Sequence, residues 1–280
     1  MQTIAELSRN SGLDALDARV LLRATLGVSD TFLIAHAGDI VGAQQAAQFC
    51  AVAARRAAGE PVAYIVGERE FYGRVFKVSP AVLIPRPETE LLVELALERL
   101  PRGERCRVLD LGTGSGCIAI SIALERSAVQ VTATDISASA LAAARLNAQR
   151  LGAGNIEFTA GAWYHAVEGE RFDVIVSNPP YVAAGDDHLG QGDLRFEPRV
   201  ALAAGVDGLD YIRAIIAGAQ RHLKPGGTLL IEHGYDQSER CRACFTAAAF
   251  SQVQSWRDIA GIERVTGGWQ APHDQGEHGA

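Results

Sequence analysis

The stretch from Arg107 to Leu124 constrains the fold of this chain more than any other. Residues 107–111 (RVLDL) have the short apolar pattern of a buried strand, and the sequence GTGSG follows at once at residues 112–116. Residues 117–124 are apolar and compatible with a helix. Glycine lacks a Cβ atom and lets the backbone approach a ligand, while the first turn of a helix presents free N–H groups. This order of strand, glycine loop and helix predicts an α/β sheet in which the loop after one strand binds a nucleotide-type ligand.

A second strand pattern favours ligand binding over an ordinary tight turn. Residues 129–134 (VQVTAT) lead to Asp135, roughly twenty residues beyond the loop, where a carboxylate can accept both hydroxyls of a ribose. The loop alone is a weak signal, because tight βα turns use glycine in the same way. The dehydrogenase fingerprint needs glycine at the sixth position of G-x-G-x-x-G, where this chain has Cys117. A nicotinamide site is therefore disfavoured.

The sequence Asn178-Pro179-Pro180-Tyr181 follows directly on a third strand pattern, residues 172–177 (FDVIVS). Each proline fixes its own φ and keeps the preceding residue out of the helical region, so the segment stays extended. An asparagine side chain and a proline carbonyl offer two acceptors for the two N–H bonds of one NH2 group, which an aromatic ring can cover. A strand-ending turn would use the same residues. Together with the loop and Asp135, the segment predicts a site that methylates a planar nitrogen.

Several further segments occur in an order that is typical of one family. They are Pro61–Gly67, Phe71–Gly73, Val82–Glu90, Phe196–Pro198, Ala203–Gly205, Asp207–Leu209 and Leu223–Gly227. With them, the chain resembles the PrmC/HemK family of class I S-adenosylmethionine-dependent methyltransferases over most of its length. This family methylates N5 of the glutamine in the Gly-Gly-Gln tripeptide of peptide-chain release factors.

The resemblance implies S-adenosyl-L-methionine as the methyl donor and release factors as the protein partner. The residues implied to bind the cofactor are Gly112, Thr113, Gly114, Ser115, Gly116, Asp135, Trp163 and Asn178. The residues implied to hold the glutamine are Asn178, Pro179, Pro180 and Tyr181. Asp135 would take the ribose hydroxyls and Trp163 would pack beside the adenine. Many members carry aspartate where this chain has Ala162, so one polar contact to the adenine would be missing or supplied elsewhere.

An amide nitrogen is a poor nucleophile, because its lone pair is delocalised into the carbonyl. We expect the side-chain oxygen of Asn178 and the backbone oxygen of Pro179 to accept the two amide hydrogens and turn the nitrogen toward the methyl donor. Transfer is then a direct displacement, for which we expect no metal. The nearby histidines His188 and His233 receive no general-base role.

We expect three regions and an α/β fold. Residues 1–58 have helical periodicity and predict a small helical domain, which by resemblance recognises the release factor. Residues 59–85 predict a linker with a β-hairpin. Residues 86–280 predict a class I methyltransferase domain, a Rossmann-like doubly wound sheet. The polar end, residues 273–280, is expected to fray.

Charge and composition limit the other classes of function. The formal net charge is −7 and the sequence pI is about 5.5. Proteins that bind nucleic acid stably by neutralising its phosphates are usually basic, so this acidic charge disfavours nucleic acid as a stable partner. The five cysteines are expected to be packing thiols in a reducing cytosol, and no apolar run is long enough to span a membrane. These features predict a cytoplasmic enzyme without membrane attachment. Two alternatives stay open: an adenine-N6 methyltransferase acting on DNA or RNA, and a non-catalytic binding protein with a methyltransferase fold.

Overall fold

The computed structural model describes residues 2–271, and the chain divides into two units. One unit contains the chain up to Glu68 together with Gly190–Phe196, and the other contains Arg69–Leu189 with the chain from Glu197 onward. The first unit therefore extends into the segment that was expected to be a linker, and it includes a piece from the second half of the chain. The expected fraying of residues 273–280 lies outside the described residues.

The first unit is helical. Its helices are α1 (Ile4–Asn10), α2 (Ala15–Leu26), α3 (Asp30–Ala35), α4 (Ala43–Ala57) and α5 (Val62–Val66). Side chains of Thr3, Asp14 and Ser29 cap the first three helices by accepting backbone N–H groups, which satisfies donors that a helix start leaves free. The core of the unit consists of Ile4, Leu7, Leu21, Leu22, Leu33, Val41, Phe49 and Ala53.

A hairpin follows, made of β1 (Glu68–Phe71) and β2 (Arg74–Lys77). The two residues between the strands, Tyr72 and Gly73, have φ values of 51° and 67°. Two successive positive φ values are typical of the tight turns whose twist matches that of a hairpin. Phe71 and Phe76 are buried in the core of the second unit, so the hairpin is packed and not a free connection.

The second unit is built on a seven-stranded sheet with the order β5-β4-β3-β6-β7-β9-β8. The strands are β3 (Arg107–Leu111), β4 (Gln130–Asp135), β5 (Ile156–Ala160), β6 (Phe172–Ser177), β7 (Leu223–Glu232), β8 (Ser251–Arg257) and β9 (Glu263–Trp269). Strands β3 to β7 are parallel, while β9 is antiparallel to both β7 and β8. The predicted strand, glycine loop and helix at residues 107–124 are present, and the predicted class I methyltransferase fold is confirmed.

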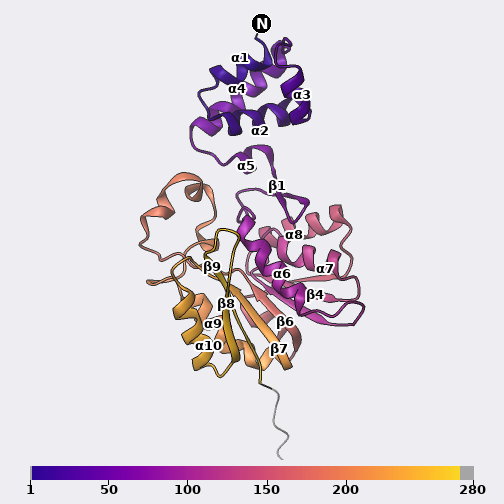
Figure 1. Ribbon diagram of the computed structural model, residues 1–280, viewed down its shortest axis with the longest axis vertical. Coiled ribbons are helices and arrows are strands. Elements are labelled where there is room, and N and C mark those ends of the chain that lie inside the picture. Colours follow the sequence, from indigo (N-terminus) through magenta and orange to yellow (C-terminus); the bar gives the residue numbers. More distant parts are fainter. Residues whose placement is uncertain (1, 272–280) are drawn as a thin grey trace, which may run out of the picture. The chain divides into compact units, whose positions relative to one another are not determined.

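Helices cover both faces of this sheet, with α9 and α10 on the side opposite α6, α7 and α8 (Figure 1). The helices are α6 (Glu90–Glu98), α7 (Cys117–Glu125), α8 (Ala138–Leu151), α9 (Asp210–His222) and α10 (Ser238–Ala247). Short 3-10 helices are η1 (Pro87–Thr89), η2 (Trp163–Val167), η3 (Asp187–Gly190), η4 (Gly192–Phe196) and η5 (Arg199–Ala201).

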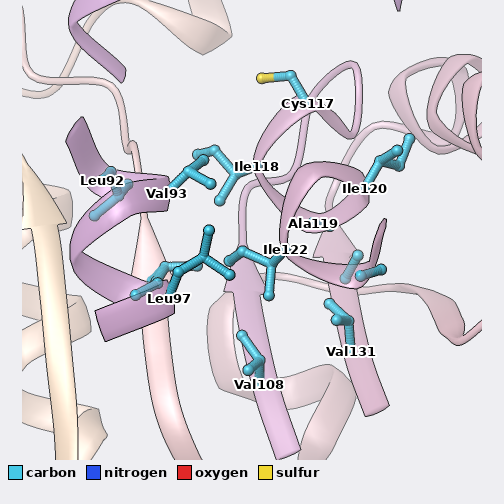
Figure 2. Close-up of a cluster of buried hydrophobic side chains, with 14 of the residues drawn as sticks. Leu92, Val93, Leu97, Val108, Cys117, Ile118, Ala119, Ile120, Ile122 and Val131 are labelled. Carbon is cyan, nitrogen blue, oxygen red and sulfur yellow. The ribbon is translucent and has the colours of Figure 1, made fainter. Parts of the chain in front are cut away.

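Adjacent strand residues enter different cores, because side chains alternate across a strand. Val108 packs in a cluster with residues of α6 and α7, shown in Figure 2, whereas its neighbour Leu109 packs in a cluster with residues of α9 and α10. Burial on both faces explains why residues 108–111 of the strand are apolar apart from Asp110. Each fully buried leucine or isoleucine in such a cluster contributes about 1.5–3 kcal/mol to the hydrophobic term.

The order of the strands determines where a ligand can bind. The chain moves outward from β3 to β4 and β5, and then returns to place β6 on the other side of β3. Such a switch point opens a crevice at the carboxyl ends of the two strands. Leu111 of β3 pairs with Ser177 of β6, so Gly112 and Asn178 leave the sheet side by side.

Candidate active site

The glycine loop after β3 is held against the end of β4. The N–H groups of Gly112 and Thr113 both donate to the Thr134 carbonyl, each at 2.9 Å. Gly112, Gly114 and Gly116 have φ values of 74°, 57° and 82°, a region that residues with a side chain rarely adopt. The sequence therefore needs glycine here for the shape of the backbone itself.

Gly116 differs in role from the rest of the loop. A Cβ atom at this position would lie 2.8 Å from Cδ1 of Ile120 and 3.1 Å from Cβ of Ala144. The pocket in front of the loop is lined by Gly112, Thr113, Gly114 and Ser115, whereas Gly116 is not among its lining residues. Gly116 lets α7 and α8 pack closely, so the cofactor contact expected for it stays a prediction.

Asp135, at the end of β4, also lines the pocket and fixes the loop. One carboxylate oxygen accepts the N–H of Gly114 at 2.9 Å, and the other accepts the N–H of Ser137 at 2.8 Å. Each carboxylate oxygen has further lone pairs. Asp135 can therefore hold the loop and accept ligand hydroxyls at the same time.

Asp110, in the strand before the loop, has a buried carboxyl group that no sequence motif indicated. Asp110 is fully buried in β3 and accepts a hydrogen bond from the Thr113 hydroxyl at 2.7 Å. Burial raises the pKa of Asp110 to about 7, and the charge of Asp135 also raises it. A charged residue within the apolar run RVLDL was the available signal, because buried carboxyl groups mark functional or structural sites.

The Asn178–Tyr181 segment divides between the pocket and the protein interior. Asn178 and Pro180 line the pocket, but Pro179 and Tyr181 are not among its lining residues. The Tyr181 ring packs against the buried cluster that contains Leu209, and its hydroxyl donates to Glu232 at 3.4 Å. Burial raises the pKa of Tyr181 well above its ordinary value. The expected cover of the substrate by this ring stays a prediction.

The side chain of Asn178 has a defined partner. Its Nδ2 donates to the hydroxyl oxygen of Thr89 at 3.1 Å. Because this bond uses the nitrogen end of the amide, the carbonyl oxygen is the end that can accept hydrogen bonds from a substrate. Thr89 itself lines the pocket and is 2% exposed. Sequence reasoning missed Thr89, since no motif connects positions so far apart.

Two aromatic rings form one wall of the pocket. Trp163 stands at the start of η2 with a φ of 50°, and its ring centre lies 5.2 Å from that of Tyr211. Both rings line the pocket, together with Gly112 and Ala162. Ala162 contributes no polar side chain to this wall. Trp163 thus lies beside Gly112 of the glycine loop, and its expected place beside the adenine stays a prediction. Tyr211 was not expected.

A half-buried ion pair lies beside another part of the pocket lining. Arg86 forms an ion pair with Glu197, whose side chain also accepts the N–H of Ile84 at 3.1 Å. Glu197 is 4% exposed, and a charge at that depth needs such partners. The pair joins the chain before η1 to the chain after Glu197, so that Pro85 and Pro198 both line the pocket.

Within residues 2–271 there is no group of three or more histidine, cysteine, aspartate or glutamate side chains suited to a metal ion. No helix in the described part of the chain is long and apolar enough to cross a membrane. Cys241 and Cys244 both lie on α10 as free thiols.

Comparison with known proteins assigns the family. A model of the PrmC N-terminal domain matches residues 1–67, and a model of the methyltransferase small domain matches residues 88–192. The release factor glutamine methyltransferase of Burkholderia pseudomallei is 53% identical over 95% of this chain and 95% of its own length. The chain belongs to the release factor glutamine methyltransferase family. The protein of the same name from Bordetella pertussis is 52% identical over 96% of this chain and 100% of its own length.

A solved structure agrees on the fold of this family member. The methyltransferase from Pyrococcus furiosus matches with a TM-score of 0.54 at 20% sequence identity, over 78% of this chain and 97% of the other. The resemblance to the PrmC/HemK family is confirmed by the relatives. Their names support glutamine methylation over the adenine-N6 and non-catalytic alternatives.

Proposed function

We propose that this chain methylates the side-chain amide nitrogen of the glutamine in the Gly-Gly-Gln tripeptide of peptide-chain release factors, with S-adenosyl-L-methionine as the methyl donor. The observation that carries the proposal is the hydrogen bond from Nδ2 of Asn178 to Thr89. It directs the acceptor end of Asn178 to a substrate, in the same pocket as the glycine loop and Asp135.

The residues of the pocket fit an adenosine-type methyl donor. The cradle of Gly112 and Gly114 leaves the backbone uncovered, and Asp135 provides acceptors for ribose hydroxyls. Ser115 lines the same pocket, and its buried hydroxyl has no hydrogen-bond partner within residues 2–271. A buried polar atom of this kind is suited to a polar ligand. Trp163 supplies a flat apolar surface for a purine.

The chain's own residues would prepare the amide for reaction. The Asn178 side-chain oxygen and the Pro179 backbone oxygen accept the two hydrogens of the glutamine NH2 group and set the direction of the nitrogen. When bound, S-adenosylmethionine would supply an electrophilic methyl group: the glutamine nitrogen would bond to the methyl carbon, the sulfur would keep the electron pair of the sulfur–carbon bond, and the nitrogen would lose one proton to water. Trp163 and Tyr211 would cover one side of the pocket with their rings.

Partner and location are part of the same proposal. The relatives named as release factor glutamine methyltransferases support a release factor as the substrate, and the helical unit is the proposed recognition surface. The net charge of −7 argues against nucleic acid as the main partner. The expected cytoplasmic location stays a prediction.

The test is transfer of labelled methyl to a purified release factor, to its Gln-to-Ala variant in Gly-Gly-Gln, and to an adenine-containing oligonucleotide. We expect label on that glutamine alone, located by mass mapping of the digested product. Label on the oligonucleotide alone would favour the adenine-N6 alternative, and S-adenosylmethionine binding without any transfer would favour a binding protein.

A further inference from the structure

The two central residues of the Asn178–Tyr181 segment are prolines, which limits how this segment can be held. Pro179 and Pro180 have no N–H group, so neither can donate a backbone hydrogen bond to the rest of the unit. Proline fixes φ but not ψ, so the Pro179 carbonyl can still turn. The Asn178 side-chain oxygen and the Pro179 carbonyl can therefore act as a fixed pair of acceptors only if both ends of the segment are held.

The first end of the segment is held by side-chain hydrogen bonds. Nδ2 of Asn178 donates to the Thr89 hydroxyl at 3.1 Å. The hydroxyl of the preceding residue, Ser177, donates to the Leu111 carbonyl at 2.8 Å. The freedom that remains to the two prolines then depends on what holds the second end, Tyr181.

Gln237 holds this second end. Its Nε2 donates to the Tyr181 carbonyl at 2.9 Å, and its Oε1 accepts the N–H of Gly234 at 2.9 Å. Because the two partners are of opposite kinds, a half-turn of the amide would set donor against donor and acceptor against acceptor. Gln237 precedes α10 and is 5% exposed. Its two hydrogen bonds are therefore buried and fixed in direction.

The backbone at Gly208 leaves room for the hydrogen bond to Tyr181. A Cβ atom at position 208 would lie 2.3 Å from the Tyr181 carbonyl oxygen and 2.7 Å from Nε2 of Gln237. Gly208 also has a φ of 75°, which residues with a side chain rarely adopt. Glycine at this position thus serves both the backbone shape and the close approach to the hydrogen bond.

Two ion pairs hold the chain beside Gly208. Asp207 pairs with Arg213 of α9 at 2.6 Å and also with Arg240 of α10. The family-typical segment Asp207–Leu209 does not line the pocket. Its position is instead explained by its packing against the hydrogen bond that holds Tyr181.

We propose that Gln237 is a positioning residue for methyl transfer, which acts through the Tyr181 carbonyl to hold the Asn178 oxygen and the Pro179 carbonyl at the spacing of a substrate NH2 group. This inference rests on the proposed function of the same segment. Gln237 does not line the pocket, so its effect on the reaction passes through the backbone of the segment.

The main test is Gln237→Met, which removes both hydrogen bonds at nearly constant shape. We expect single-turnover transfer to a release factor to slow about 10-fold to 100-fold, because small displacements of a positioning group are costly. The Kd of S-adenosylhomocysteine should stay within about threefold of wild type. The matched control is Gln270→Met, because Gln270 is 6% exposed and its Nε2 donates to the Gln220 carbonyl at 3.2 Å, away from the pocket lining. Urea unfolding should show similar losses of stability in both variants, while only Gln237→Met slows transfer.

Gln237→Glu separates the two hydrogen bonds of the side chain. An ionised carboxylate still accepts the N–H of Gly234 but cannot donate to the Tyr181 carbonyl. This variant should fold with the Gly234 contact intact and should still transfer more slowly than wild type. The loss should be partial, because the N–H of Val182 continues to donate to the Leu202 carbonyl at 2.9 Å. Transfer at the wild-type rate in both Gln237 variants would overturn the inference.

Gly208→Ala disturbs the same hydrogen bond from its other side. Its control is Gly152→Ala, because Gly152 has a φ of 77° and its added Cβ would meet no atom within 4 Å in the described part of the chain. Both substitutions cause similar backbone strain, but only Gly208→Ala should slow transfer. Equal rates in the two alanine variants would contradict a role for this hydrogen bond.

The double variant Asn178→Ala/Gln237→Met tests whether Gln237 acts through the segment. The loss caused by Gln237→Met should be much smaller once Asn178 is alanine, because one of the two acceptors that it positions is already gone. Losses that multiply would mean that Gln237 acts on the reaction by another route.

The carbonyl carbon resonance of Tyr181 gives a readout that does not depend on turnover, since it responds to the hydrogen bond that this carbonyl accepts. It should shift in the same direction in Gln237→Met, Gln237→Glu and Gly208→Ala, and stay at its wild-type position in Gln270→Met. An unshifted resonance in Gln237→Met would refute the anchor itself. If wild type methylates release factors and Gln237→Met matches its rate, the inference alone fails. If wild type transfers no methyl to any release factor, the proposed function fails and the inference falls with it.

Discussion

At the scale of single residues, neighbours in one motif have separate tasks. Asn178 lines the pocket, whereas the Tyr181 ring is packed in the interior with its hydroxyl on Glu232. The sequence indicated that residues 178–181 lie near the reaction, because the two prolines restrict the backbone conformation of this segment. It did not indicate which side chains face the pocket, since that depends on packing against α9 and β7.

Asp135 should control cofactor affinity. In Asp135→Asn, one oxygen acceptor becomes an NH2 donor that faces the N–H of Gly114 or Ser137, and the charge is lost. We expect the Kd of S-adenosylhomocysteine to increase about 10-fold to 100-fold, or about 1.4–2.7 kcal/mol. Isothermal titration calorimetry measures this, and an unchanged Kd would show that Asp135 only holds the loop.

Tyr181→Phe should move the loss of stability with rising pH to higher pH. The Tyr181 hydrogen bond lowers the pKa of Glu232, so its removal should raise that pKa. The loss in unfolding free energy should be about 1 kcal/mol, because the hydrogen bond that is removed is long at 3.4 Å. Urea unfolding between about pH 5 and about pH 8 measures both effects. An unchanged pH dependence would show that the Tyr181 hydroxyl does not act on Glu232.

At the scale of elements, the glycine loop and the two strands beside it could be predicted, because strand, loop and helix are contiguous in sequence. The switch point between β3 and β6 followed from the fold class. The bond between Thr89 and Asn178, and the ion pair of Arg86 with Glu197, join residues that are distant in sequence. Nothing in local periodicity reports such contacts, which arise only when the sheet is assembled.

Gly116→Ala should destabilise the second unit more than Gly169→Ala. The two glycines have similar φ values, 82° and 80°, so both substitutions cause backbone strain of about 1–3 kcal/mol. Only at Gly116 does the new Cβ meet neighbours, Ile120 at 2.8 Å and Ala144 at 3.1 Å. We expect an additional loss of about 1–3 kcal/mol from overpacking. Urea unfolding measures the free energy of unfolding of both variants. Equal losses of this free energy would show that α7 and α8 can move apart to accommodate the added Cβ atom.

At the scale of the whole molecule, the helical unit takes in a segment from the methyltransferase half of the sequence. Arg56 pairs with Asp193 at 2.8 Å, and Arg195 donates to the Ala58 carbonyl at 2.6 Å. The helical periodicity of residues 1–58 predicted helices. It could not predict that Gly190–Phe196 belongs to the same unit, because this membership depends on a few long-range polar contacts.

The buried carboxyl groups should make the protein less stable as the pH rises. The pKa of Glu232 is about 7 in the folded chain against an ordinary value of 4.5, so between these values the folded state binds a proton that the unfolded state has lost. The corresponding stability is present below about pH 4.5 and is lost as the pH rises through about 7. Asp110 contributes in the same direction.

Glu232→Gln should therefore flatten the dependence of the unfolding free energy on pH. Urea unfolding of wild type and variant at about pH 5 and about pH 8 measures this difference, with the Asp110 contribution common to both proteins. An identical dependence in the two proteins would mean that Glu232 does not hold a proton in the folded state.

Asn178 is expected to orient the substrate amide, while other residues hold the cofactor. The most direct measurement is single-turnover methyl transfer to a release factor by Asn178→Ala, with the cofactor Kd determined on the same preparation. We expect transfer slower by about 100-fold or more and a Kd within about threefold of wild type. Transfer at the wild-type rate would contradict this role of Asn178, and so would a loss of cofactor binding large enough to explain the slower transfer.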